Sequence, residues 1–157
     1  MKKIVMLLAL ALVAAPAFAG DSGILKLSLW GKKLAVALPN HTQNVTGVEL
    51  GIGSDTESLK GVQLDFVYSK ADDLVGVQSA LLGKASHVTG VQWSFINLSD
   101  GLVSGVQAGL YNQAEELHGL QFGLVNNVKT IHGLQIGLVN LAGNGWFPVM
   151  VIVNGRF

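Results

Sequence analysis

The sequence predicts an all-β protein, and we expect an antiparallel up-and-down meander that closes into a barrel of about ten strands. Three observations lead to this fold: one short phrase recurs seven times, apolar and polar residues alternate inside it, and polar connectors separate the copies. A fixed period indicates one small structural unit copied side by side. Alternation with a period of two residues is typical of a strand with one apolar face.

The repeated phrase is clearest in Gly105–Asn112, Gly119–Asn126 and Gly133–Asn140, which fit the pattern G-[LV]-Q-x-G-L-x-N. Looser copies begin at Gly47, Gly61, Gly76 and Gly90, and the glycines that open successive repeats are 14 or 15 residues apart. We number the positions of each repeat from this glycine, which is position 0. The repeats therefore start at residues 47, 61, 76, 90, 105, 119 and 133.

Positions 1, 3 and 5 of the repeats are mostly apolar, whereas positions 0, 2 and 4 are small or polar. We expect the apolar positions to form one face, which meets either lipid or a protein core. The predicted apolar face includes Val62, Leu64, Phe66, Val91, Trp93, Phe95, Leu120, Phe122, Leu124, Leu134, Ile136 and Leu138. Position 2 lies on the opposite face and predicts a polar belt, formed by Glu49, Gln63, Gln78, Gln92, Gln107, Gln121 and Gln135.

Two architectures can stack such repeats, and the length of the strand favours one of them. A strand of ten residues is about 33 Å long, so the few residues left in each repeat cannot return the chain to its start. We therefore expect one strand and one turn per repeat. The alternative is a parallel β-solenoid, in which each repeat is a full coil that bends inside the segment.

The flanks of the repeats predict three more strands. Residues 24–30 alternate, residues 33–38 follow a tight turn at Gly31, and residues 146–157 close the chain. Seven repeats and three flanking strands make about ten, an even number that suits a closed barrel with no free edge.

The N-terminus predicts export. Residues 1–19 read as a signal peptide, with Lys2 and Lys3 before an apolar run and Ala17-Phe18-Ala19 before the cleavage point. Residues 20–157 then form a single repeat β-domain. The absence of cysteine excludes disulfides and thiolate metal sites, and the absence of a basic stripe argues against nucleic-acid binding.

Two functions fit these observations. If the apolar face meets lipid, the protein is a small outer-membrane β-barrel, either a structural envelope component or a narrow pore. The last strand ends in Phe157, with Val149, Val151 and Val153 in phase before it. This ending resembles the C-terminal assembly signal of bacterial outer-membrane barrels, which implies contact with the barrel-assembly machinery and with membrane lipid.

The alternative function is a secreted or surface-displayed repeat β-protein that acts as a binding module. The pattern G-[LV]-Q-x-G-L-x-N resembles that of a family of bacterial surface repeat proteins, closely over residues 105–140 and loosely over residues 47–97. The resemblance implies a location in the outer membrane or at the cell surface of a Gram-negative bacterium. It implies no catalytic or ligand-binding residues.

Few residues offer chemistry, and we predict no enzyme, no cofactor and no metal. Glu49 and Asp65 are the only acids within the repeat strands and would form an acidic spot in a lumen. His118 and His132 share position −1 of successive repeats. They would lie within metal-bridging distance in a parallel array, but toward opposite ends of neighbouring strands in the antiparallel meander.

Overall fold

The computed structural model describes residues 22–38 and 43–157, and they form one mixed sheet. Its strands are β1 (Ser22–Trp30), β2 (Leu34–Leu38), β3 (Asn44–Ser99), β4 (Leu102–Ala108), β5 (Tyr111–Ala142) and β6 (Val149–Arg156). These elements confirm the prediction of an all-β chain. The predicted signal peptide lies outside the described residues. Within those residues, no helix has the length and apolar character needed to cross a membrane.

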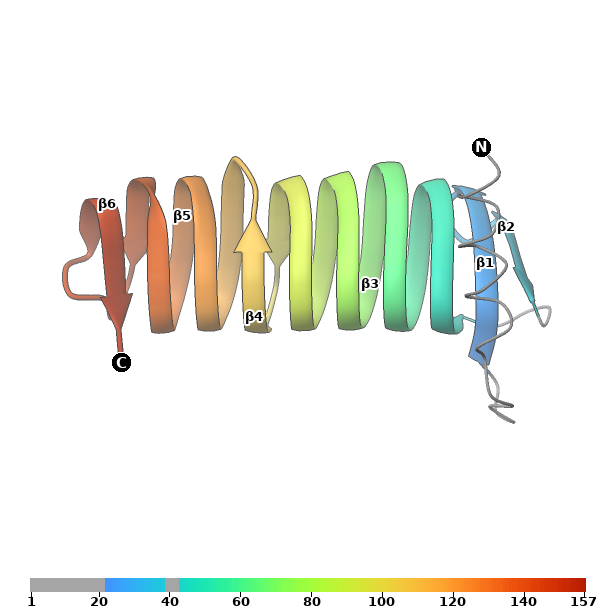
Figure 1. Ribbon diagram of the computed structural model, residues 1–157, viewed down its shortest axis with the longest axis horizontal. Helices are drawn as coiled ribbons and strands as arrows, with labels where there is room; N and C mark the ends of the chain where they lie inside the picture. The colour runs from blue at the N-terminus through green and yellow to red at the C-terminus, as the bar shows by residue number, and fades with distance from the viewer. Residues whose placement is uncertain (1–21, 39–42) are drawn as a thin grey trace, which may run out of the picture.

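Neighbouring repeats pair in parallel, one whole repeat apart. Gly90 lies opposite Gly105, and Gln107 lies opposite Gln121. The long strands β3 and β5 therefore wind along the molecule in successive turns, with β4 between them, as Figure 1 shows. We call each turn a coil, and each coil holds one repeat.

The predicted antiparallel pairing of repeats is therefore wrong, and the opening glycine helps to explain why. At position 0 the φ angle lies between 134° at Gly90 and 152° at Gly47, a region that L-residues rarely adopt. A Cβ atom at Gly105 would collide with the carbonyl oxygen of Gly90 in the preceding coil. The parallel stacking of the repeats therefore requires glycine at position 0, where neighbouring coils approach each other closely.

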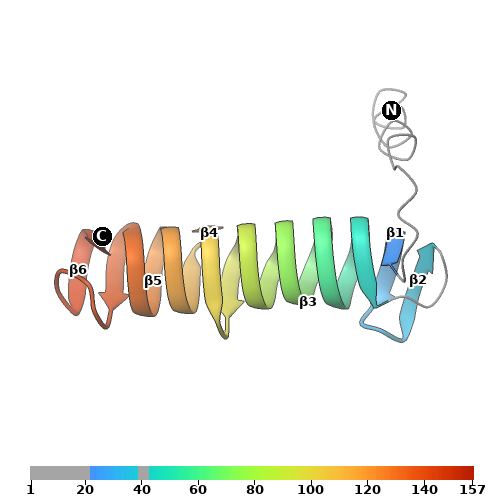
Figure 2. The same ribbon diagram turned by 90° about the horizontal axis from the view of Figure 1, so that it is seen from below.

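Both ends of the coil array are covered by further strands where the sequence predicts them, although the C-terminal strand begins at Val149 rather than at residue 146. β1 pairs in parallel with the first coil, with Lys26 opposite Glu49, and β2 folds back antiparallel onto β1. At the other end β6 runs antiparallel to the last coil, with Asn154 opposite Gln135. Figure 2 shows these strands at opposite ends of the array. The sheet has β2 and β6 as its two edges, so the expected closure of about ten strands does not occur among the described residues.

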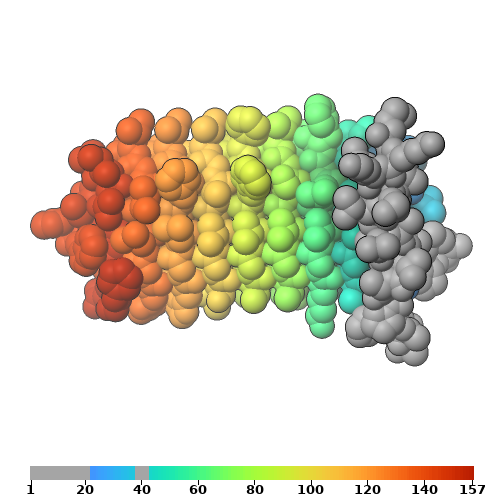
Figure 3. Space-filling model, viewed as in Figure 1, coloured from blue at the N-terminus to red at the C-terminus, as the bar shows by residue number. Residues whose placement is uncertain are grey.

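The interior of the coils holds buried side chains from every repeat. Position −2 contributes a column of fully buried aliphatic side chains, and smaller residues such as Ala71 and Ala114 pack beside it. The column consists of Val45, Leu59, Leu74, Val88, Val103, Leu117 and Ile131. Because equivalent residues repeat at the spacing of neighbouring strands, side chains of successive coils stand in rows along the molecule, as Figure 3 shows.

Candidate functional site: an apolar face over a filled polar interior

The predicted polar belt is a hydrogen-bonded ladder inside the coils. All seven position-2 side chains are 0 % exposed. Each glutamine from Gln78 to Gln135 donates its Nε2–H to the Oε1 atom of the preceding glutamine at 2.8 Å. Gln63 donates to Glu49 at 3.1 Å. The ladder satisfies polar atoms that would otherwise be costly to bury.

A second ladder runs beside the first in the opposite direction. At position 7, Asn97 donates to Asn112, Asn112 to Asn126, and Asn126 to Asn140, each at 2.8 Å. It starts at Asn97 because the preceding coil has Gly83 at this position, and Asn97 Oδ1 has no hydrogen-bond partner. The glutamine ladder joins each coil to the next, and from Asn97 to Asn140 the asparagine ladder adds a second series of such bonds.

An ion pair closes the N-terminal end of the glutamine ladder. Lys26 Nζ lies 2.9 Å from Glu49 Oε1, and both side chains are almost completely buried. Ser28 and Thr56 also donate hydroxyl hydrogen bonds to Glu49. Sequence reasoning missed Lys26, although Leu25, Leu27 and Leu29 alternate around it and place it on the inward face of β1.

Asp65, the other predicted lumen acid, is also buried. Its Oδ2 atom accepts hydrogen bonds from the hydroxyls of Ser54 and Ser69, whereas its Oδ1 atom has no partner. Burial raises the pKa of Asp65 from 3.8 to about 6, against the opposing effect of the two hydroxyl donors. Neither acid faces an open lumen; both are part of the packed interior.

The predicted apolar residues lie on the outside of the coils. In the seven repeats, positions 1, 3 and 5 hold no acidic, basic or histidine residue, and Ser79 is their only polar member. We call this surface the apolar face. Its largest side chains protrude: Phe66 is 74 % exposed, Trp93 69 % and Leu138 64 %. Exposed apolar surface that is contiguous over a whole molecule marks an interaction site.

The two ends of the molecule extend the apolar face. A groove of about 780 Å³ lies between the β1–β2 hairpin and the first coil, and it is lined by Leu27, Leu34, Val36, Leu50 and Ile52 among others. At the opposite end β6 exposes more aliphatic surface. The predicted assembly signal Phe157 is 90 % exposed, and its ring centroid lies 6.3 Å from that of Trp146.

The more exposed ion pairs occupy the connector part of the coils instead. They join neighbouring coils, since Lys84 pairs with Asp100 at 3.0 Å and Lys129 with Glu115 at 2.6 Å. Lys70 lies 3.4 Å from Asp55 and 3.5 Å from Asp72. The coils of the first six repeats are therefore amphipathic, with apolar side chains on one part of the circumference and charged side chains on another, whereas residues 133–148 carry no charge.

Comparison with known proteins identifies no relative of this chain. No protein-family model, no curated protein and no solved structure matches it.

Proposed function

We propose that this protein is a parallel β-solenoid, exported to the outer membrane or cell surface, that acts as a non-enzymatic binding module and docks its apolar face on membrane lipid. The observation that carries the proposal is the continuous outward row of uncharged side chains at positions 1, 3 and 5. The parallel register of the repeats supports the solenoid. The two ladders and the aliphatic column are buried inside the described coils, which favours a binding surface on the outside over a pore.

Lipid fits this face better than a protein partner does. Protein interfaces carry about one hydrogen bond per 100–200 Å², and these bonds help to set register and specificity. The apolar face offers almost no side-chain donors or acceptors, because Ser79 and the indole of Trp93 are its only polar groups. Acyl chains require no such partners, and Trp and Phe side chains favour the boundary between headgroups and acyl chains.

Flotation with neutral phosphatidylcholine vesicles tests this proposal. We expect the mature chain, residues 20–157, to float with the vesicles because apolar burial contributes about 25 cal/mol per Å². The triple variant Phe66→Ser, Trp93→Ser, Phe122→Ser should remain in the dense fraction. A matched triple variant on the charged part of the coils, Glu57→Ser, His87→Ser, Lys129→Ser, should float like the wild type.

Two results would contradict lipid docking. One is a chain that stays monomeric and ignores the vesicles. The other is a dimer in vesicle-free buffer that the Phe66, Trp93 and Phe122 substitutions dissociate, which would assign the face to a second copy of the chain.

A further inference from the structure

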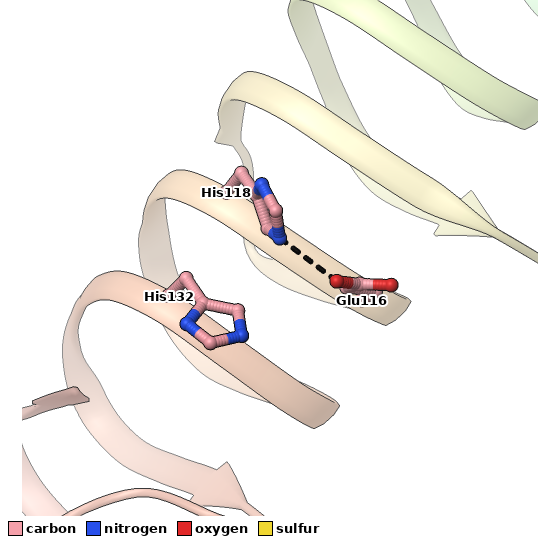
Figure 4. Close-up of side chains that lie close together, drawn as sticks. All are labelled: Glu116, His118 and His132. Carbon is pink, nitrogen blue, oxygen red and sulfur yellow. Dashed lines mark hydrogen bonds and ion pairs between the residues drawn. The ribbon is translucent and has the colours of Figure 1, made fainter. Parts of the chain in front are cut away.

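The parallel register brings together three potential metal ligands that the antiparallel meander would have separated. His118 and His132 occupy position −1 of successive repeats, and Glu116 lies two residues before His118. The ligand atoms of these three side chains all lie within 4.8 Å of one another. Figure 4 shows His118 joined to Glu116 by a hydrogen bond, with His132 on the neighbouring coil.

The three side chains lie close enough together to bind one metal ion. His118 Nε2 lies 2.8 Å from Glu116 Oε1, and the two imidazole rings meet edge to face with centroids 4.9 Å apart. A tetrahedral zinc site with Zn–N bonds of 2.0–2.1 Å separates its ligand atoms by about 3.3 Å. His118 and Glu116 are about half exposed, and His132 is also exposed, so small side-chain rotations reach this spacing.

The backbone beneath the cluster is held in register by the interior. Gln135 donates to Gln121 and Asn126 donates to Asn140, which aligns the coil of His132 with that of His118. Neighbouring strands lie about 4.8 Å apart, so the two histidines start from adjacent, fixed positions. Glu115, the acid next to Glu116 in the chain, pairs with Lys129 at 2.6 Å.

We propose that Glu116, His118 and His132 form a surface site for a divalent transition metal of the Zn²⁺ class. Two imidazoles and one carboxylate favour Zn²⁺, Ni²⁺ or Cu²⁺ over Ca²⁺ and Mg²⁺, which prefer oxygen ligands. Three protein ligands leave one coordination position for water or an exchangeable ligand. The metal takes the place of the His118–Glu116 hydrogen bond, and it binds imidazole nitrogens that carry no proton.

Calorimetric titration of the untagged mature chain with Zn²⁺ tests the site. We expect one ion per chain with a dissociation constant below about 100 µM. His118→Ala and His132→Ala should each weaken binding at least about tenfold, since each removes one of three ligands. Glu116→Gln should also weaken it, because the amide removes the anionic ligand.

His87 supplies the matched control. It is an exposed histidine whose Nδ1 atom lies 3.5 Å from Asp73, and among the described residues this pair has no third ligand. His87→Ala should leave the zinc affinity unchanged, and the electron paramagnetic resonance spectrum of the Cu²⁺-loaded wild type should show two coordinated nitrogens. A wild type without saturable binding in this range, or a His118→Ala/His132→Ala double variant that binds like wild type, would overturn the proposal. The apolar-face triple variant should bind zinc normally, which separates this test from that of lipid docking.

Discussion

Each polar residue of the interior has a hydrogen-bond partner in a neighbouring coil or a connector. Asp65 is the residue whose burial is least well compensated by such partners. Its carboxyl group is buried, with two hydroxyl donors on Oδ2 and none on Oδ1. Burial therefore disfavours the charged form more than the hydroxyls stabilise it. The folded chain binds a proton at Asp65 more tightly than the unfolded chain does.

The stability of the protein should consequently depend on pH through Asp65. The pKa of Asp65 is raised from 3.8 to about 6 on folding, so its favourable contribution is complete below pH 3.8 and is lost as the pH rises through about 6. Asp65→Asn keeps an acceptor for the two hydroxyls but cannot ionise. We expect it to stabilise the chain by about 1 kcal/mol at pH 7 relative to wild type, after allowance for solvent screening.

Urea denaturation at pH 4.5 and pH 7 measures this effect. The difference between variant and wild type should shrink at the lower pH, where the wild-type carboxyl is protonated. Parallel pH profiles for the two proteins would show that Asp65 does not titrate differently in the folded state.

Among the structural elements, the glutamine ladder has a donor-to-acceptor direction, so a glutamine inside the ladder makes more ladder bonds than the glutamine at its end. Gln121 both donates to Gln107 and accepts from Gln135, at 2.8 Å in each case. Gln135 donates to Gln121, but its own Oε1 atom has no hydrogen-bond partner because β6 places no donor on it. The ladder therefore ends on one buried unsatisfied acceptor.

Gln121→Leu should destabilise the protein more than Gln135→Leu. The first substitution breaks two ladder bonds and leaves Gln107 Oε1 without its donor. The second substitution breaks one ladder bond. It removes the unsatisfied Oε1 atom of Gln135 and leaves the Oε1 atom of Gln121 unsatisfied instead. Because a buried unsatisfied group costs about 1–3 kcal/mol, we expect the free energies of unfolding to differ by about that amount in chemical denaturation. Equal losses for the two variants would mean that the ladder bonds do not contribute to stability.

At the scale of the whole molecule, the strands at the two ends of the coil array determine whether further chains can add to it. A parallel coil leaves unpaired backbone donors and acceptors at each end, and such edges recruit further strands. β2 covers one end through β1, and β6 covers the other through its antiparallel pairing with residues 133–141. A bulge interrupts that last pairing, and Ile152 adopts a φ of 71° beside it.

Removing the C-terminal strand should therefore cause end-to-end association. A chain that stops at residue 142 exposes the backbone edge of the last coil together with Gln135 Oε1. We expect its mass in light scattering to rise with concentration, while its β-sheet circular dichroism is retained. The double variant Phe147→Ser, Phe157→Ser is the control, since it removes exposed apolar surface but keeps the strand. A truncated chain with the same mass as the full-length protein would contradict this role of β6.

Much of the local structure could be predicted from the repeat itself. The period, the alternation at positions 1 to 5, the grouping of the position-2 residues on one face and the strands at both flanks are all properties of neighbouring residues in the chain. The direction of pairing was predicted wrongly. It depends on whether the chain turns inside the repeat, and the positive φ of Gly105 and its equivalents becomes evident only when the preceding coil is in place.

The candidate sites, too, could be predicted from the sequence only in part. Because side chains of an extended chain alternate, the sequence by itself determined an all-β protein with one uncharged face and one glutamine face. Only the tertiary structure decided that the glutamines bond to one another inside a filled coil, that Lys26 neutralises Glu49, and that His118 meets His132. Each of these contacts joins residues at least 14 positions apart, and it is the register between coils, not the alternation within one, that brings them together.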